Sequence, residues 1–159
     1  MRNILILTAF LLVIFCANAQ DSLSKIPELN QKIIAFVNQH KGKKVDRGEC
    51  WDLAAIPLNE NNAKWDGTYG FGKKVDYKKD IIFPGDIIQF EKVIIKYTEG
   101  KATYTVNLYH HTAIVYEVKG PGEYKIAEQN TEKGKKVTFS DLNLNFMTKG
   151  KVQFYRPEN

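Results

Sequence analysis

The order in which two apolar patterns follow one another most constrains what this chain can fold into. In the segment 26–40 apolar residues recur at helical spacing, namely Leu29, Ile33, Phe36 and Val37. From Pro84-Gly85-Asp86 onward, short apolar runs alternate with turn signals, which is typical of strands. Because helices come first and a meander of strands follows, we predict an α+β fold with N-terminal helices packed on an antiparallel sheet.

The boundaries of the expected elements follow from local signals. Asp46 and Glu49 form a D-x-x-E pattern, which predicts an N-cap and capping box for a second helix that begins around Arg47. Pro57 is expected to kink or end that helix. A short helix or turn is expected over 141–146, and strands over 87–90, 92–97, 102–108, 111–118, 124–129, 137–139 and 152–155.

The first 19 residues show the pattern of a secretory leader. Arg2 precedes an apolar run from Ile4 to Phe15, and Ala17-Asn18-Ala19 is a small-x-small cleavage site. The pattern predicts a signal peptide over 1–19, followed by a single domain over 20–159. The apolar run is short for a membrane span, so we expect a secreted or periplasmic protein without stable membrane insertion after cleavage.

The charge balance narrows the choice of partners. The chain carries a formal charge of +5 at pH 7, and many of its lysines stand in pairs. A basic balance favours anionic partners such as cell-wall polymers, whereas scattered, solvated lysines are the plainer interpretation. No nucleic-acid motif is present, so we expect no nucleic-acid partner, and we expect a monomer.

Cys50 is the one cysteine left once Cys16 is removed with the predicted leader, so it has no internal disulfide partner. A helix start stabilises the thiolate form, which makes Cys50 a candidate nucleophile. Its base should be a histidine. His40 ends the first predicted helix and has no obvious route to Cys50.

His110 and His111 point to opposite faces of one predicted strand. His111 shares its face with Ala113 and Val115, which suit packing on the Cys50 helix, so we predict His111 as the base.

A base histidine is usually oriented by a third polar group. Glu128 and Asn130 lie two apart on the next predicted strand, so both are expected on one face beside His111. Glu128 would accept from the imidazole, with Asn130 assisting or replacing it. The plainer alternative is a buried free thiol, a solvated histidine and a polar strand end.

Four runs in this order carry a resemblance to a known family: Gly48-Glu49-Cys50-Trp51-Asp52-Leu53-Ala54, Pro84-Gly85-Asp86-Ile87-Ile88-Gln89-Phe90, His111-Thr112-Ala113-Ile114-Val115 and Ile126-Ala127-Glu128-Gln129-Asn130. Over about 45–155 the chain resembles the NlpC/P60 superfamily of papain-like cysteine peptidases and amidases, in particular its CHAP branch. The resemblance implies a papain-like fold with Cys50 as nucleophile, His111 as base, and Glu128 with Asn130 as the orienting pair.

The run around Cys50 also looks like the cysteine-proteinase-fold domain at the C-terminus of fungal SH3 adaptors that bind myosin tails. That resemblance implies an adaptor or scaffold role.

The chain departs from the CHAP pattern at two places. Glu49 stands where the branch usually has Gln, beside the expected oxyanion hole, so the backbone N–H of Cys50 would carry more of that task. Asp52 matches one position of a calcium loop, but lysines occupy the preceding loop, so we expect no metal and no cofactor.

Aromatic residues near the cysteine are candidates for lining a substrate groove, with core or cleft-wall packing as the alternative: Trp51, Trp65, Tyr69 and Phe71. Together these features predict a cysteine hydrolase that cleaves an amide or peptide bond, most readily in peptidoglycan. The alternatives are a non-catalytic binding or adaptor module on the same fold, and an interbacterial toxin that degrades cell walls.

Overall fold

The computed structural model describes residues 26–159, and the predicted leader over 1–19 lies outside the described residues. Two helices precede the strands, α2 (Glu28–His40) and α3 (Cys50–Glu60). The remaining elements are β1 (Lys73–Val75), β2 (Ile87–Glu99), β3 (Ala102–Gly120), β4 (Glu123–Glu128), β5 (Thr138–Asn143), the short helix η1 (Leu144–Phe146) and β6 (Met147–Arg156).

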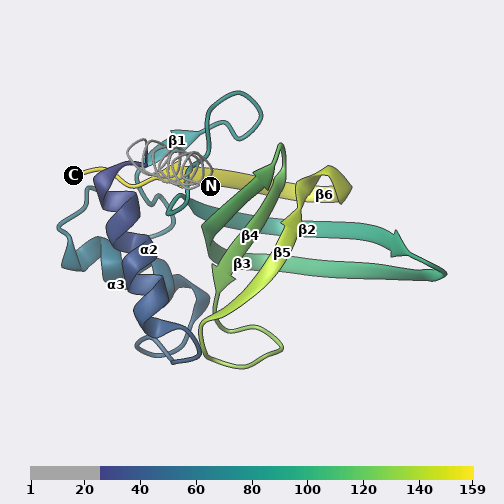
Figure 1. Cartoon of the computed structure of the whole chain (residues 1–159), viewed down its shortest axis with the longest axis horizontal. Helices are drawn as coiled ribbons and strands as arrows, with labels where there is room; N and C mark the ends of the chain where they lie inside the picture. Colours follow the sequence, from purple (N-terminus) through teal and green to yellow (C-terminus); the bar gives the residue numbers. More distant parts are fainter. Residues whose placement is uncertain (1–25) are drawn as a thin grey trace, which may run out of the picture.

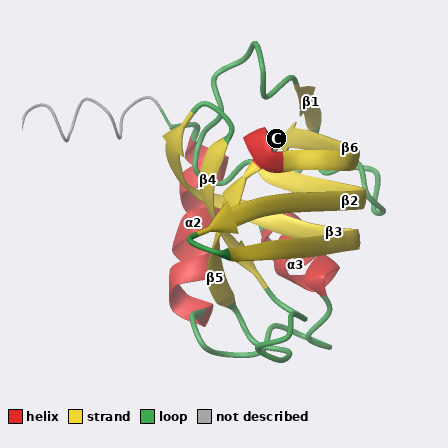
Figure 2. Ribbon diagram, turned by 90° about the vertical axis from the view of Figure 1, so that its right-hand side faces the viewer, coloured by secondary structure: helices red, strands yellow, loops and turns green. Residues whose placement is uncertain are grey.

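The strands form one antiparallel sheet in the order β1-β6-β2-β3-β4-β5. The two helices lie together at one end of the molecule, and the β2–β3 hairpin extends away from them (Figures 1 and 2). The predicted α+β architecture, with helices packed on an antiparallel sheet, is confirmed.

Helix α2 forms where the helical spacing predicts it, and its apolar stripe is buried against the rest of the domain. The helix ends at His40, whose ring stacks on Phe36 at a centroid distance of 4.1 Å. The Nδ1 of His40 lies 2.8 Å from the carbonyl oxygen of Phe36. His40 is therefore tied to its own helix, as its position at the helix end led us to expect.

Helix α3 begins three residues later than predicted, with Cys50 as its first residue. Asp46 adopts a left-handed backbone conformation, with φ 48°, and does not cap the helix. Instead, the Asp52 carboxylate accepts the backbone N–H of Glu49 at 3.0 Å, so the capping pair is Glu49 and Asp52. The helix also runs on to Glu60, about one turn past Pro57.

Several predicted strands merge into two long ones. The segments 87–90 and 92–97 both belong to β2, and 102–108 and 111–118 both belong to β3. Lys92 lies between the two halves of β2 with φ 54°, yet the pairing with β3 keeps one register on both sides of it. The predicted helix or turn over 141–146 contains the end of β5 and η1, whereas β1 is a short strand that the sequence analysis did not predict.

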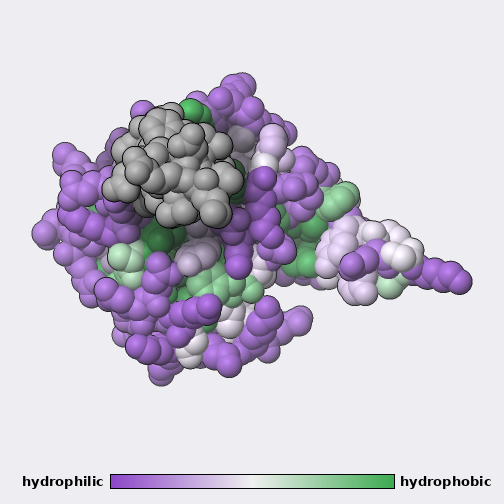
Figure 3. Space-filling model, in the orientation of Figure 1, coloured by the Kyte–Doolittle hydropathy of each residue, from purple (hydrophilic) through white to green (hydrophobic). Residues whose placement is uncertain are grey.

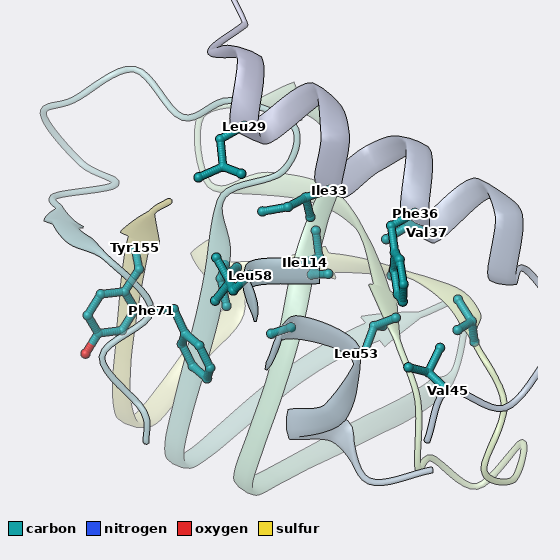
Figure 4. Packing of buried hydrophobic residues seen from close by; sticks show 14 residues of the cluster. Leu29, Ile33, Phe36, Val37, Val45, Leu53, Leu58, Phe71, Ile114 and Tyr155 are labelled. Atoms are coloured by element: carbon teal, nitrogen blue, oxygen red, sulfur yellow. The ribbon is translucent and has the colours of Figure 1, made fainter. Parts of the chain in front are cut away.

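Two clusters of buried side chains stabilise the fold, one on each face of the sheet. The first joins the helices to the sheet and contains Ile114 of β3 (Figure 4). The second lies on the other face and contains Ala113 and Val115 of β3. Because neighbouring residues of β3 enter different clusters, both faces of its central part are buried.

The Pro84-Gly85-Asp86 turn connects the sheet to α2. Gly85 has φ 87°, and a Cβ at this position would lie 2.5 Å from the backbone oxygen of Asn30, so glycine is required. The buried Asp86 carboxylate accepts from Asn30 Nδ2 at 2.9 Å, from the Phe83 N–H at 2.9 Å, and from Arg156 Nη2 at 2.9 Å. This network joins α2, the turn and β6.

Asp86→Ala is expected to lower the free energy of unfolding by about 3 kcal/mol, because it leaves the Arg156 guanidinium without its buried partner. Urea unfolding measures the change. Asp141→Ala is the matched control, since Asp141 forms its ion pair with Lys119 on the surface, and its effect should be much smaller. Equal losses from the two changes would contradict a central role for the Asp86 network.

Candidate functional site around Cys50, His111 and Glu128

The thiol of Cys50 lies at the first position of α3, against β3. It interacts with the imidazole of His111 and with the backbone N–H groups of Thr112 and Trp51. Burial alone raises the pKa of Cys50, but the hydrogen bond and charge of His111 and these N–H groups lower it below its usual 9.0 overall. The surroundings of Cys50 therefore favour the thiolate.

His111 connects the thiol to Glu128. Its Nε2 lies 2.9 Å from Glu128 Oε2, which leaves Nδ1 as the ring nitrogen for Cys50. The other oxygen of the same carboxylate, Oε1, accepts the hydroxyl of Ser140 at 2.6 Å. Cys50, His111, Glu128 and Ser140 thus form one continuous chain of polar contacts drawn from α3, β3, β4 and β5.

Opposing effects set the charge of this chain. Burial lowers the pKa of His111, but its contacts with Cys50 and Glu128 outweigh burial and raise that pKa to about 9. Burial raises the pKa of Glu128, yet the hydrogen bonds from His111 and Ser140 bring it below its usual value. At neutral pH the site consequently holds an imidazolium between a carboxylate and a thiol with a lowered pKa.

The reasoning that led from strand faces to His111 needs correction. Ala113 and Val115 pack in the second cluster, on the face away from the helices, whereas Ile114 packs with the helices. His111 nevertheless interacts with Cys50. His110 instead pairs with Glu91 at 2.8 Å and lies 41% exposed.

Asn130 does not lie beside His111. Strand β4 ends at Glu128, and Asn130 has φ 61°, so the strand alternation that would place both residues on one face stops before it. Its Nδ2 donates to Glu49 Oε2 at 2.7 Å, while Lys135 Nζ lies 2.5 Å from Glu49 Oε1. Both oxygens of the Glu49 carboxylate are therefore engaged by residues that follow β4.

Gln129 is a structural residue of the site that the sequence analysis missed. Its side chain is completely buried and donates to the carbonyl oxygens of Glu49 at 2.8 Å and Val45 at 3.1 Å. Its Oε1 accepts the N–H of Val45 at 3.1 Å. Its position between Glu128 and Asn130, two predicted site residues, was the one signal in the sequence that could have pointed to Gln129. Ser140 was missed because the predicted strand stopped at 139.

The aromatic residues expected to line a groove instead pack on one another. Trp51 lies against Trp65 at 5.5 Å, and Trp65 stacks on Phe71 at 5.8 Å. Tyr69 is 43% exposed and meets the ring of His110 edge-on at 4.5 Å. Trp51, Trp65 and Tyr69 therefore belong, with Phe71, to one group of packed aromatic rings, and a role in substrate binding stays a prediction.

A cleft of about 1090 Å³ begins at His111 and Glu128 and is bounded by the β2–β3 hairpin and the β4–β5 hairpin. We call the outer part of the β2–β3 hairpin, residues 92–108, the arm. Ile95, Tyr97, Val106 and Leu108 give the arm side of the cleft an apolar wall, which Phe146 of η1 extends; Thr105 and Asn107 also line this side. Figure 3 shows this apolar surface where the arm leaves the body.

Within residues 26–159, no group of three or more His, Cys, Asp or Glu side chains is arranged to hold a metal ion. Asp52, the one match to a calcium loop, pairs with Arg47 at 2.5 Å. No helix in the described part of the chain is both long and apolar enough to cross a membrane.

The helix-borne cysteine, the strand-borne histidine and the α+β architecture define a cysteine-proteinase-fold domain. Residues 19–159 match the family model of the AIM3/BBC1 cysteine-proteinase-fold domain, and the chain belongs to this family. Of the two resemblances seen in the sequence, the one to the fungal adaptor domain is therefore confirmed, and the CHAP branch is not.

A named relative is Altered inheritance of mitochondria protein 3 of Debaryomyces hansenii. It is 33% identical over 162 residues, which cover 84% of this chain but only 17% of that protein. Two crystal structures of Ly7917, one with the hydrolyzing product of MDP, are 18% and 20% identical with TM-scores of 0.47. They cover 79% and 80% of this chain, and 62% and 63% of theirs.

The yeast relative corrects two expectations. It is named for the inheritance of mitochondria, an organelle inside the cell, so the predicted secreted or periplasmic location is wrong. The peptidoglycan substrate predicted together with that location is not supported either. That location was predicted from an apolar run with a small-x-small motif, which lies outside the described residues.

Glu128→Gln is expected to lower the pKa of His111 from about 9 toward 6.5, because an amide no longer stabilises the imidazolium. NMR titration of the His111 ring measures the shift. Ser140→Ala should lower that pKa less, since it removes only a support of the carboxylate.

Asn130→Ala is the control for this titration, because Asn130 contacts Glu49 and should leave the His111 pKa near its starting value. A larger shift in Asn130→Ala than in Glu128→Gln would show that the contacts of His111 are misassigned.

Proposed function

We propose that this domain is a protein-interaction module of adaptor type, which holds an extended polypeptide segment of a partner in the cleft beside the arm. The observation that carries the proposal is the cleft itself, with a volume of about 1090 Å³ and an apolar wall. Contiguous exposed apolar surface of this kind is typical of interaction sites.

Contacts between aromatic side chains support the apolar wall of the cleft. Tyr97 stacks on Tyr104 at 5.2 Å and contacts Phe146 at 6.2 Å. Val106 and Phe146 of the wall nevertheless remain 39% and 48% exposed, and Tyr104 beside the wall is 45% exposed. A partner that covers these side chains would gain the hydrophobic free energy that the domain alone leaves unused.

Family membership supports an interaction role. The relative from Debaryomyces hansenii is much longer, and the matched region is only 17% of it, as expected for one module of a multi-part protein. A module of this kind needs a binding surface but no turnover.

Val106→Asp should weaken peptide binding by about tenfold or more, because it places a charge on the apolar wall. Peptides selected from a displayed library of disordered protein segments are the probe, and fluorescence polarisation gives Kd. Val118→Asp is the matched control, since Val118 lies on the same strand, is 40% exposed against 39% for Val106, and does not line the cleft. Failure to select any peptide, or equal losses in both variants, would count against the proposal.

A second candidate function is hydrolysis of an amide or peptide bond, and the chain of contacts from Cys50 through His111 to Glu128 favours it. The Cys50 thiolate would bond to the carbonyl carbon, and His111 would pass its proton to the departing nitrogen as the C–N bond breaks. Water would then displace the sulfur of the thioester and return a proton to His111. The Glu49 carboxylate, held by Asn130 and Lys135, would leave oxyanion stabilisation to backbone N–H groups.

The hydrolase candidate predicts fast alkylation of Cys50 by iodoacetamide at pH 6, because a lowered pKa keeps the thiolate present as the pH falls. The rate should decline only at a lower pH than for a free thiol with a pKa of about 8.5. Mass spectrometry of the selected peptides should then show cleavage by the wild type, and binding without cleavage by Cys50→Ser. Free-thiol behaviour of Cys50, or intact peptides, would reject hydrolysis and leave binding in place.

A further inference from the structure

The arm leaves one edge of β3 without a strand partner in the described part of the chain. On one side β3 pairs with β2 from Ala102 to Ile114. On the other side β4 joins it only from Ile114 onward. The stretch of β3 before Ile114 therefore has a free edge, which natural sheets usually cover or shorten.

The chain after β4 is held away from this edge. Extension of the pairing of Ile114 with Ala127 would bring Asn130 opposite His111. Instead, the left-handed Asn130 and the buried Gln129 bond to residues before α3, as described above. The free edge is thus a consequence of the same contacts that position Cys50.

The direction of the backbone groups along this edge follows from one residue. Val115 donates its N–H to Asp86 and accepts the N–H of Gly85 with its C=O, so both of its groups point toward the β2 side. In an antiparallel strand the direction alternates with each residue. The N–H of Thr112 accordingly points the other way, toward Cys50.

The alternation is interrupted once along β3, because Lys92 has φ 54° and does not pair with Tyr109, and Leu108 packs on the same face as Ala113 and Val115. In a strand the face of a side chain and the direction of its backbone groups are linked, so the backbone groups of Leu108, Val106 and Tyr104 point to β2 as those of Val115 do. The N–H and C=O groups of Thr105 and Asn107 therefore point to the free edge. The residues Thr105 to His111 line the cleft without interruption. A row of unpaired backbone donors and acceptors therefore runs along the cleft.

We propose that the bound polypeptide forms an added strand on the free edge of β3, along Thr105–His111, with main-chain hydrogen bonds to the arm. This proposal rests on the proposed binding function and names how the partner is recognised. Strand addition takes affinity from the backbone and selectivity from alternate side chains, which here would face the apolar wall at Val106 and Phe146.

The occupant is a single extended segment, because the edge is recessed. The β4–β5 hairpin forms the far side of the cleft, with Glu123, Asp141 and Asn143. An added strand needs about 4.8 Å beside β3, whereas a second folded copy would have to bring its own sheet past this wall. The seven positions from Thr105 to His111 correspond to a peptide span of roughly 23 Å at about 3.3 Å per residue.

The added strand would lead toward Cys50. Thr112 and His111, at the inner end of the free edge, both contact the thiol. A main-chain amide of the bound segment would consequently lie next to Cys50, whether or not that amide is cleaved.

The test uses three fluorescent peptides with the same side chains. The parent is acetyl-Lys-Val-Thr-Val-Thr-Val-Lys-amide, and in the two derivatives every second backbone nitrogen is methylated, in one phase or the other. Only one edge of a strand pairs, so one derivative should lose about tenfold or more in affinity and the other should bind within about twofold of the parent. Binding should also slow the NMR amide exchange of Thr105 and Asn107, but not of Tyr104, Val106 and Leu108, whose backbone groups already point to β2.

Asn107→Pro removes one outward N–H and should weaken the parent peptide, whereas Asn107→Thr keeps that N–H and should retain the exchange pattern. Equal binding of both methylated peptides would reject strand addition and leave cleft binding by side chains intact. No binding of the parent peptide, while library peptides bind, would reject it as well. Protection of the edge amides that grows with protein concentration, without peptide, would identify a second copy as the occupant and overturn the proposal.

Discussion

The attachment of the chain after β4 to the start of α3 is the constraint on which the rest of this domain depends. The buried amide of Gln129 bonds to Val45 and Glu49, and Asn130 bonds to the side chain of Glu49. A buried amide is costly unless its hydrogen bonds are satisfied, so this attachment specifies one position for the helix start. It places Cys50 against β3 and directs the chain away from the edge of the arm.

The polar chain from Cys50 to Ser140 depends on that position. Burial disfavours each charge, but a thiolate, an imidazolium and a carboxylate in sequence stabilise one another. The raised pKa of His111, about 9, is the sum of contacts from both sides. The pKa of each group therefore depends on the charge of its neighbours. A change at Glu128 or Ser140 alters the pKa of His111 and, through His111, that of Cys50.

Binding and hydrolysis make different demands on the same geometry. An interaction module needs the apolar wall and the free strand edge, whereas a hydrolase also needs the thiolate and a proton donor at the inner end of that edge. The cleft begins at His111 and Glu128 and continues along the arm, so both demands meet at one place. A domain that no longer cleaves its partner could accordingly still bind it through the apolar wall and the free strand edge.

The sequence by itself determined the α+β order of elements, the face of α2 that is buried, and the family motifs that single out Cys50, His111 and Glu128. These features depend on local periodicity and turn chemistry, which act between near neighbours. It did not determine the start of α3, since the D-x-x-E pattern favours Asp46 as the cap, and only the contact between Glu49 and Asp52 places the start at Cys50.

Only the tertiary structure decided the roles of Asn130, Gln129 and Ser140. Strand alternation predicts a common face for Glu128 and Asn130, but it holds only while the strand continues, and the left-handed backbone of Asn130 ends it. Ser140 reaches Glu128 from a strand whose pairing register no local pattern specifies. The free edge of β3 could not be predicted for the same reason. Whether this edge is paired depends on where the distant chain after β4 is attached.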